Sequence, residues 1–202
     1  MNMKTYALLI IPFLFITSCK KKQEGNNCVG APESAIEGVW QTQCLSSSST
    51  SYQTSVTVLC STLSWQTSFF SATGCVESSK TRILTNSGGF FTTIGASSSV
   101  SGATEVDISN GTIELMPVTS AEASAMNASS YCGMSNWTVN VKQSVSGYCG
   151  LDFYGYHGAK SFSVYQVVST LLYFGTSSAS FDGTSAAKRF NTLGSLGYVK
   201  SQ

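Results

Sequence analysis

The feature that most limits the possible folds of this chain is a series of short apolar–polar alternations, separated by runs of serine and glycine. The clearest alternations cover residues 137–142 and 162–168, where nearly every second side chain is apolar. A period of two places apolar side chains on one face of a β-strand, whereas a helix repeats every three to four residues. Because turn-forming runs such as 46–51 and 97–101 divide these segments, the sequence predicts an all-β fold of about 8–10 short antiparallel strands, closed as a barrel or packed as a sandwich. The weaker strand candidates are residues 38–44, 52–60, 63–71, 81–85, 89–95, 171–175 and 197–200.

An Asn-Gly pair within one alternating segment predicts a tight hairpin. Asn110 and Gly111 suit a two-residue turn, since both residues tolerate positive φ. This turn would place Asp107 opposite Glu114 on the outer face, with Glu105 on the same face. Facing carboxylates can share acid and base roles because proximity separates their pKa values. An acidic outer face that discourages edge pairing, or a calcium site, would produce the same pattern.

Helical signals are few. Thr119 followed by Glu122 matches a capping box and predicts a helix over residues 121–129. A second short helix is predicted over residues 185–191. The fold class therefore contains one or two short helices beside the strands.

Six cysteines follow residue 20, an even number that is typical of disulfides in an exported protein. Metal binding is the rival interpretation, but the chain has no C-x-x-C pair and one histidine. If the first three strands pair in sequence, the natural pairings are Cys44–Cys75 and Cys28–Cys60, which leaves Cys132–Cys149. Spacing alone keeps other pairings open.

Charged residues make up only 10% of the chain, well under the usual quarter, and the net charge is +1. No basic stripe is present, so nucleic acid is not an expected partner. No motif for a cofactor is present either.

The N-terminus carries an apolar run over residues 6–16, which is too short to span a bilayer comfortably. It follows Lys4, as in a secretory signal. The run ends in Ile16-Thr17-Ser18-Cys19, which resembles the lipobox of bacterial lipoproteins.

This resemblance implies that residues 1–18 are a signal peptide and that Cys19 carries a diacylglycerol. Residues 19–32 would then be a lipidated tether, and residues 33–202 a single barrel domain. The membrane is the implied partner, and the lysines that follow Cys19 would lie at its headgroups. Since residue 20 is not Asp, the family's sorting rule favours the outer membrane. An ordinary signal peptide with a chance cysteine is the alternative.

The entry to the first strand, Gly38-Val39-Trp40 after a short turn, resembles lipocalins and related small barrels. In that family the tryptophan plugs the closed end of the barrel, and a basic residue from late in the chain packs over it. The resemblance implies these roles for Trp40 and Arg189. Alternatively, Trp40 is simply a core aromatic residue. The second lipocalin signature, Thr-Asp-Tyr, is absent.

Candidate catalytic groups are incomplete. The only histidine, His157, lies five residues after Asp152, but no G-x-S-x-G motif supplies a nucleophile. Ser185 and Lys188 match S-x-x-K without the partner motifs of penicillin-recognising enzymes. An aromatic cluster could line a ligand mouth or form a packed corner; its members are Tyr148, Phe153, Tyr154 and Tyr156.

These observations favour a non-catalytic, lipid-anchored binding module of the bacterial envelope, with a small apolar or amphipathic ligand in the barrel. A structural or surface-interaction protein without a pocket is the main alternative. A hydrolase using Asp107/Glu114 or Ser185/Lys188 ranks last, because no constellation is complete.

Overall fold

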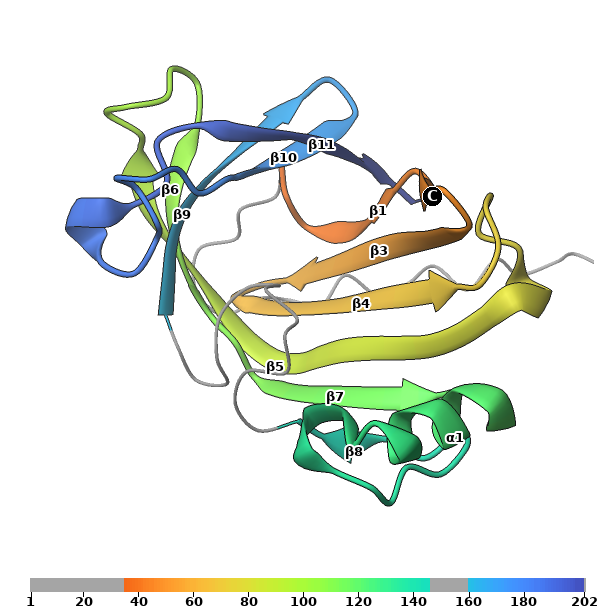
Figure 1. Cartoon of the computed structure of the whole chain (residues 1–202). Coiled ribbons are helices and arrows are strands. Elements are labelled where there is room, and N and C mark those ends of the chain that lie inside the picture. Colours follow the sequence, from red (N-terminus) through yellow and green to blue (C-terminus); the bar gives the residue numbers. More distant parts are fainter. Residues whose placement is uncertain (1–34, 146–159, 202) are drawn as a thin grey trace, which may run out of the picture.

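The computed structural model describes residues 35–145 and 160–201, and these form an antiparallel sheet of eleven strands with one α-helix. The fold is therefore all-β, as the alternation predicts (Figure 1). In this part of the chain, no helix is long and apolar enough to cross a membrane. The elements are β1 (Gly38–Thr42), β2 (Leu45–Ser47), β3 (Thr50–Leu59), β4 (Thr62–Phe70), β5 (Lys80–Ala96), β6 (Thr104–Ser109), β7 (Thr112–Pro117), α1 (Ser120–Ala128), β8 (Gln143–Ser144), β9 (Lys160–Val168), β10 (Leu171–Gly175) and β11 (Leu193–Lys200).

Eight of the strands close a barrel in the order β1, β3, β4, β5, β6, β9, β10 and β11, and β11 returns to pair with β1. Every pairing in this ring is antiparallel. The closing pair sets Trp40 opposite Lys200. Closure removes the exposed strand edges that an open sheet would present to other chains.

The predicted hairpin at Asn110-Gly111 is wrong. Strands β6 and β7 do not pair with each other; both pair with the same side of β5 and follow one another along it (Figure 1). The register runs on across the interruption, with Ser109 opposite Phe90 and Thr112 opposite Ser87. The turn that reverses the chain is instead the loop between β5 and β6. The predicted strands 81–85 and 89–95 are likewise one continuous strand, β5.

Gly111 is required by close packing rather than by a turn. A Cβ on Gly111 would overlap the carbonyl oxygen of Ser87 on β5 and lie 2.5 Å from the carbonyl carbon of Gly88. Gly88, on the facing strand, is the residue that has positive φ, at 72°. The Asn-Gly pair therefore marks a point where two strands approach unusually closely, which is another use of glycine in a sheet.

The alternation at residues 137–142 also fails as a strand, since only Gln143–Ser144 of this region pairs, as β8 with β7. The side chain of Asn127 of α1 forms hydrogen bonds with both backbone polar groups of Trp137. Its Oδ1 accepts from the Trp137 amide at 2.6 Å, and its Nδ2 donates to the Trp137 carbonyl at 3.0 Å. The indole is buried, with 3% of its surface exposed. These contacts satisfy the backbone polar groups that a strand partner would otherwise take.

The helix prediction is confirmed. The Thr119 hydroxyl caps α1 by accepting from the Glu122 amide at 3.1 Å. The Glu122 carboxylate does not complete the capping box but pairs with Arg82 of β5 at 2.9 Å, which ties the helix to the sheet. The second predicted helix is reduced to a short 3₁₀ turn, Ala186–Lys188.

The predicted disulfide Cys44–Cys75 is confirmed, with 5.7 Å between the Cα atoms. It joins the start of β2 to the segment after β4, which is where pairing of the first strands was expected to bring these residues. Cys60 and Cys132 are also disulfide-bonded. Their predicted partners, Cys28 and Cys149, lie outside the described residues.

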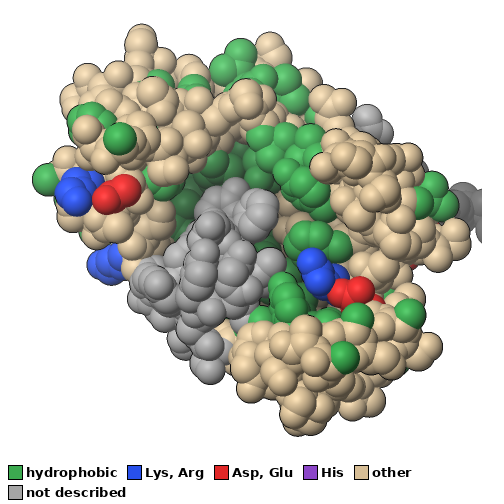
Figure 2. Space-filling view, viewed as in Figure 1, with side chains coloured by type: hydrophobic (Ala, Val, Ile, Leu, Met, Phe, Trp, Pro, Cys, Tyr) green, Lys and Arg blue, Asp and Glu red, His purple; other side chains and the backbone are tan. Residues whose placement is uncertain are grey.

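One apolar cluster fills the barrel and continues under α1. Alternating residues of each strand supply it, for example Val56 and Val58 of β3 and Leu63 and Trp65 of β4. Figure 2 shows hydrophobic side chains gathered in a hollow on one face of the molecule, surrounded mainly by backbone and by side chains that are neither hydrophobic nor charged. The inside of the barrel is therefore a candidate binding site.

Candidate functional site

Trp40 of β1 belongs to the apolar cluster inside the barrel and is 2% exposed. Its indole N–H donates to the Ile36 carbonyl at 2.6 Å, which binds the turn before β1 to this tryptophan. The Lys200 ammonium lies 5.3 Å from the centre of the indole ring, within the range of a cation–π contact. Lys200 is therefore the late basic residue that packs over Trp40.

Arg189 does not have the role predicted for it. It lies on the outer wall, where its guanidinium contacts Glu105 at 3.3 Å and Asp107 at 2.8 Å. It also donates to the backbone carbonyls of Val106 at 2.6 Å and Ser163 at 3.0 Å. Only 11% of the side chain is exposed. The arginine therefore fastens the loop between β10 and β11 to β6 and β9.

The predicted carboxylate pair Asp107/Glu114 does not form. The two residues are seven positions apart on the continuous β6–β7 line, which corresponds to about 23 Å at about 3.3 Å per residue. Asp107 binds Arg189, and Glu114 pairs with Lys142 at 3.3 Å. The carboxylates cannot share a proton or a substrate at this separation.

Ser185 and Lys188 lie at an exposed 3₁₀ turn. The Lys188 amine contacts Asp182 at 3.4 Å, so it is engaged with a carboxylate rather than with the serine hydroxyl. Asp182 in turn accepts from the hydroxyl of Thr184 at 2.6 Å and from its amide at 3.0 Å. These hydrogen bonds, led by the hydroxyl, lower the pKa of Asp182.

Several predicted positions fall outside the described residues. They are the lipidation candidate Cys19, the cysteines Cys28 and Cys149, the pair Asp152 and His157, and the aromatic cluster of Tyr148, Phe153, Tyr154 and Tyr156. Within residues 35–145 and 160–201, no three side chains of the ligating types gather as they would around a metal ion.

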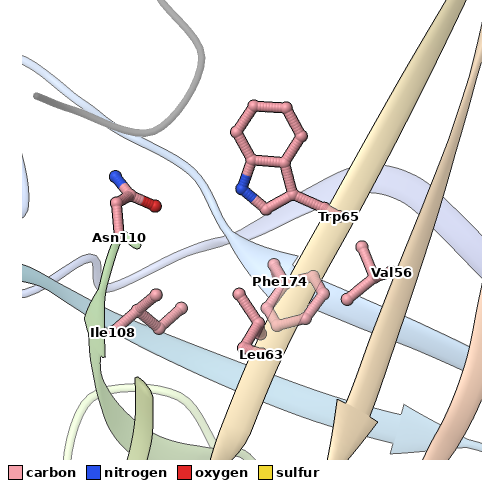
Figure 3. A pocket seen from close by; sticks show the side chains of 6 residues that line it. All are labelled: Val56, Leu63, Trp65, Ile108, Asn110 and Phe174. Carbon is pink, nitrogen blue, oxygen red and sulfur yellow. The ribbon is translucent and has the colours of Figure 1, made fainter. Parts of the chain in front are cut away.

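The interior of the barrel contains a mainly apolar cavity of about 20 Å³ (Figure 3). Strands β3, β4, β6 and β10 contribute its apolar walls. One polar side chain, Asn110, lies at its edge, and Figure 3 shows its amide on the same side as the indole nitrogen of Trp65. The lining residues are Val56, Leu63, Trp65, Ile108, Asn110 and Phe174.

Asn110 is held in place by a second buried amide, Asn86 of β5. The Nδ2 of Asn86 donates to the Asn110 Oδ1 at 3.4 Å, and its Oδ1 accepts from the Gly111 amide at 2.8 Å. The exposed fractions are 1% for Asn86 and 6% for Asn110. An apolar cavity with one oriented polar group is the usual chemistry of a small-molecule site.

Sequence reasoning missed Lys200, Trp65 and Asn110 as site residues. Asn110 was assigned to a turn, and Trp65 lies in one of the weaker strand candidates. The position of Lys200 depends on its register with Trp40. Only the alternation in residues 63–71 could have indicated that Trp65 faces inward beside Leu63.

Comparison with known proteins gives no further assignment, since no protein-family model and no curated protein matches the chain.

Proposed function

We propose that this protein is a lipid-anchored lipoprotein of the bacterial cell envelope, and that its barrel is a non-catalytic binding module for a slender apolar or amphipathic ligand. The observation that carries the ligand class is the cavity between β3, β4, β6 and β10. Five of its six lining side chains are apolar, and the sixth, Asn110, is an amide held by Asn86. Such a site recognises shape and apolar surface, with one hydrogen bond to orient a polar end.

The size of the cavity restricts the ligand. At about 20 Å³ it is far smaller than the roughly 300–1,000 Å³ of sites for drug-sized molecules. We therefore infer a narrow ligand such as an acyl chain, which displaces the Trp65 or Phe174 ring as it enters. A rigid polycyclic ligand does not fit this description.

The proposed anchoring to the membrane is supported by the sequence alone. The motif that ends in Cys19 supports lipidation, the following lysines support contact with anionic headgroups, and the absence of Asp at position 20 supports the outer membrane. Cys19→Ser in the full chain should move the protein from the membrane fraction to the soluble fraction. Mass spectrometry of the N-terminal peptide should show the acyl chains in the wild type alone. A wild-type peptide without acyl groups would contradict the anchor.

The ligand is tested by native mass spectrometry of the full chain after mild detergent extraction. Val56→Phe adds bulk inside the cavity, whereas Val39→Phe makes the same change at an outward residue that is 41% exposed. We expect a bound small molecule in the wild type and in Val39→Phe, and none in Val56→Phe. Circular dichroism checks that both variants fold, since overpacking costs about 1–3 kcal/mol. Equal ligand occupancy in both variants, or an empty wild type, would refute the proposal.

A second candidate, a structural or surface-interaction protein without a pocket, is favoured by one observation, the small volume of the cavity. Its contacts would come from the serine-rich loops at residues 46–51 and 97–101. Because Ser51 is buried and donates to the Ala72 carbonyl at 2.6 Å, the first loop should be altered at Ser48 and Ser49 rather than deleted. Loss of binding to an envelope partner in those variants, together with an empty cavity, would select this candidate.

A further inference from the structure

A polar pocket, here called the outer pocket, lies on the outside of the barrel between two loops. One is the loop between β5 and β6, and the other connects β10 to β11; Figure 1 shows both at the same end of the molecule. The volume of the outer pocket is about 320 Å³, within the range of about 300–1,000 Å³ typical of small-molecule sites. It is separate from the interior cavity, because Ile108 of β6 lines the cavity, whereas Glu105 of β6 lines the outer pocket.

Both loops are held in place without a ligand. Arg189 fastens the β10–β11 loop to the barrel wall through the contacts described above. In the other loop, the Ser97 hydroxyl accepts from the amides of Ser99 at 3.2 Å and Val100 at 3.1 Å. This bend leaves Ser98 and Ser99 exposed at the rim of the pocket. The pocket is therefore preorganised, which reduces the entropy lost on binding.

The charges of the outer pocket disfavour an anion. Arg189 is matched by two carboxylates, Glu105 and Asp107, so the cluster has a surplus of one negative charge. One carboxylate oxygen of Glu105 forms an ion pair with Arg189. The other oxygen has no hydrogen-bond partner in the described part of the chain. The hydroxyls of Ser98 and Ser99 are also without partners among the described residues.

Apolar surface completes the lining. Phe181 and Phe190 of the β10–β11 loop are both half-buried and border the pocket. The Phe190 ring packs on Gly183, where a Cβ would lie 2.7 Å from the ring, so its position is fixed. The outer pocket thus combines hydrogen-bond acceptors, hydroxyls and two aromatic rings.

We propose that the outer pocket binds a neutral carbohydrate. The hydroxyls of a sugar can donate to Glu105 and can both donate to and accept from Ser98 and Ser99. The C–H faces of a sugar ring pack well on aromatic rings such as Phe181 and Phe190. A sugar carries no charge, so it avoids repulsion from the surplus carboxylate.

The test is isothermal titration calorimetry of the full chain with glucose, galactose, mannose, N-acetylglucosamine and trehalose. Ala187→Trp fills the pocket from an exposed position, and Ala125→Trp makes the same change on the exposed face of α1. We expect saturable binding of at least one sugar by the wild type and by Ala125→Trp. Ala187→Trp should weaken it by at least about tenfold, since the ring occupies the sugar's place. Glu105→Gln keeps the side-chain shape but loses the charge, and should weaken binding by up to about tenfold.

Either of two results would overturn the proposal: none of the five sugars binds, or the affinity of Ala187→Trp for the sugar equals that of Ala125→Trp. If no sugar binds but tetramethylammonium does, with the same sensitivity to Ala187→Trp, the outer pocket is a cation site instead.

Discussion

Replacing Gly111 by alanine should destabilise the protein more than its place in an Asn-Gly pair suggests. In the structure, a methyl group at this position would overlap the Ser87 carbonyl oxygen and would also lie 2.7 Å from the Gly89 amide nitrogen. Both neighbours are backbone atoms, which cannot rotate away as a side chain can. Strands β5 and β7 would have to separate locally, at the expense of the hydrogen bond between the Gly111 amide and Asn86.

The expected cost combines two effects. Overpacking costs about 1–3 kcal/mol, and the lost hydrogen bond about 0.5–1.5 kcal/mol, so the free energy of unfolding should fall by about 2–4 kcal/mol. Gly88→Ala is the matched control, because Gly88 lies on β5 directly beside Gly111. Its φ is 72°, and a methyl group on it would lie more than 4 Å from any other heavy atom beyond its chain neighbours. The control should lose about 1–2 kcal/mol through its left-handed backbone alone.

The assay is urea unfolding of the full chain, followed by tryptophan fluorescence with the slope checked for constancy. A hairpin at Asn110-Gly111 would require positive φ at Gly111 and would make alanine cost about 1–2 kcal/mol there, without the clash. If Gly111→Ala proves no more destabilising than Gly88→Ala, the continuous β6–β7 line is wrong.

Three further predictions concern stability and titration. Replacing Cys44 and Cys75 by serine should reduce the free energy of unfolding by up to about 3.7 kcal/mol, the loop-entropy value for a separation of 31 residues; an unchanged urea midpoint would contradict it. Thr119→Ala should cost about 1 kcal/mol in the same assay by removing the cap of α1, and a neutral effect would argue against the cap. Carboxyl ¹³C NMR should place the pKa of Asp182 below its ordinary value, and Thr184→Val should raise that pKa. Because the pKa of Asp182 is lower in the folded state than in the unfolded state, this group stabilises the fold at pH values above its unfolded pKa. That contribution is lost as the pH falls through the folded-state pKa. An Asp182 that titrates normally in the wild type would contradict the prediction.

The parts of the fold that sequence predicted are those decided by local chemistry. The cap of α1 depends on Thr119 and Glu122, which are three residues apart. The Cys44–Cys75 disulfide depends on the first strands pairing in sequence, which short turns favour. Alternation likewise identified β9, although its central residues Ser163, Val164 and Tyr165 are all buried in the structure. The weaker candidate at residues 171–175 is β10, which does alternate between buried and more exposed positions.

The parts that sequence missed depend on distant residues. The residues next to Asn110-Gly111 in the sequence do not distinguish a hairpin from a continuous strand. The need for glycine at position 111 comes from its close contact with the backbone of Ser87 and Gly88, which belong to β5. The same holds for residues 137–142, whose alternation would suit a strand, but whose backbone groups at Trp137 are taken by Asn127 of the helix. In both places a long-range contact overrides a clear local pattern.

The choice between Arg189 and Lys200 shows how barrel closure decides the site. Both are basic residues near the C-terminus, so composition and order cannot separate them. The pairing of β11 with β1 sets Lys200 opposite Trp40, and the loop before β11 carries Arg189 to the outer wall instead. The residue that covers the tryptophan is therefore the one within the closing strand.

Strand β6 carries both proposed sites because its side chains alternate between two faces. Val106 and Ile108 point into the core, whereas Glu105 and Asp107 reach Arg189 outside. A slip of one residue in its pairing would send the carboxylates inward and the apolar residues outward, and so destroy both sites at once. Single substitutions should behave differently: a change at Ile108 should alter the interior ligand and leave sugar binding intact. The alternation that indicates the fold is thus also the property that keeps the two sites chemically distinct.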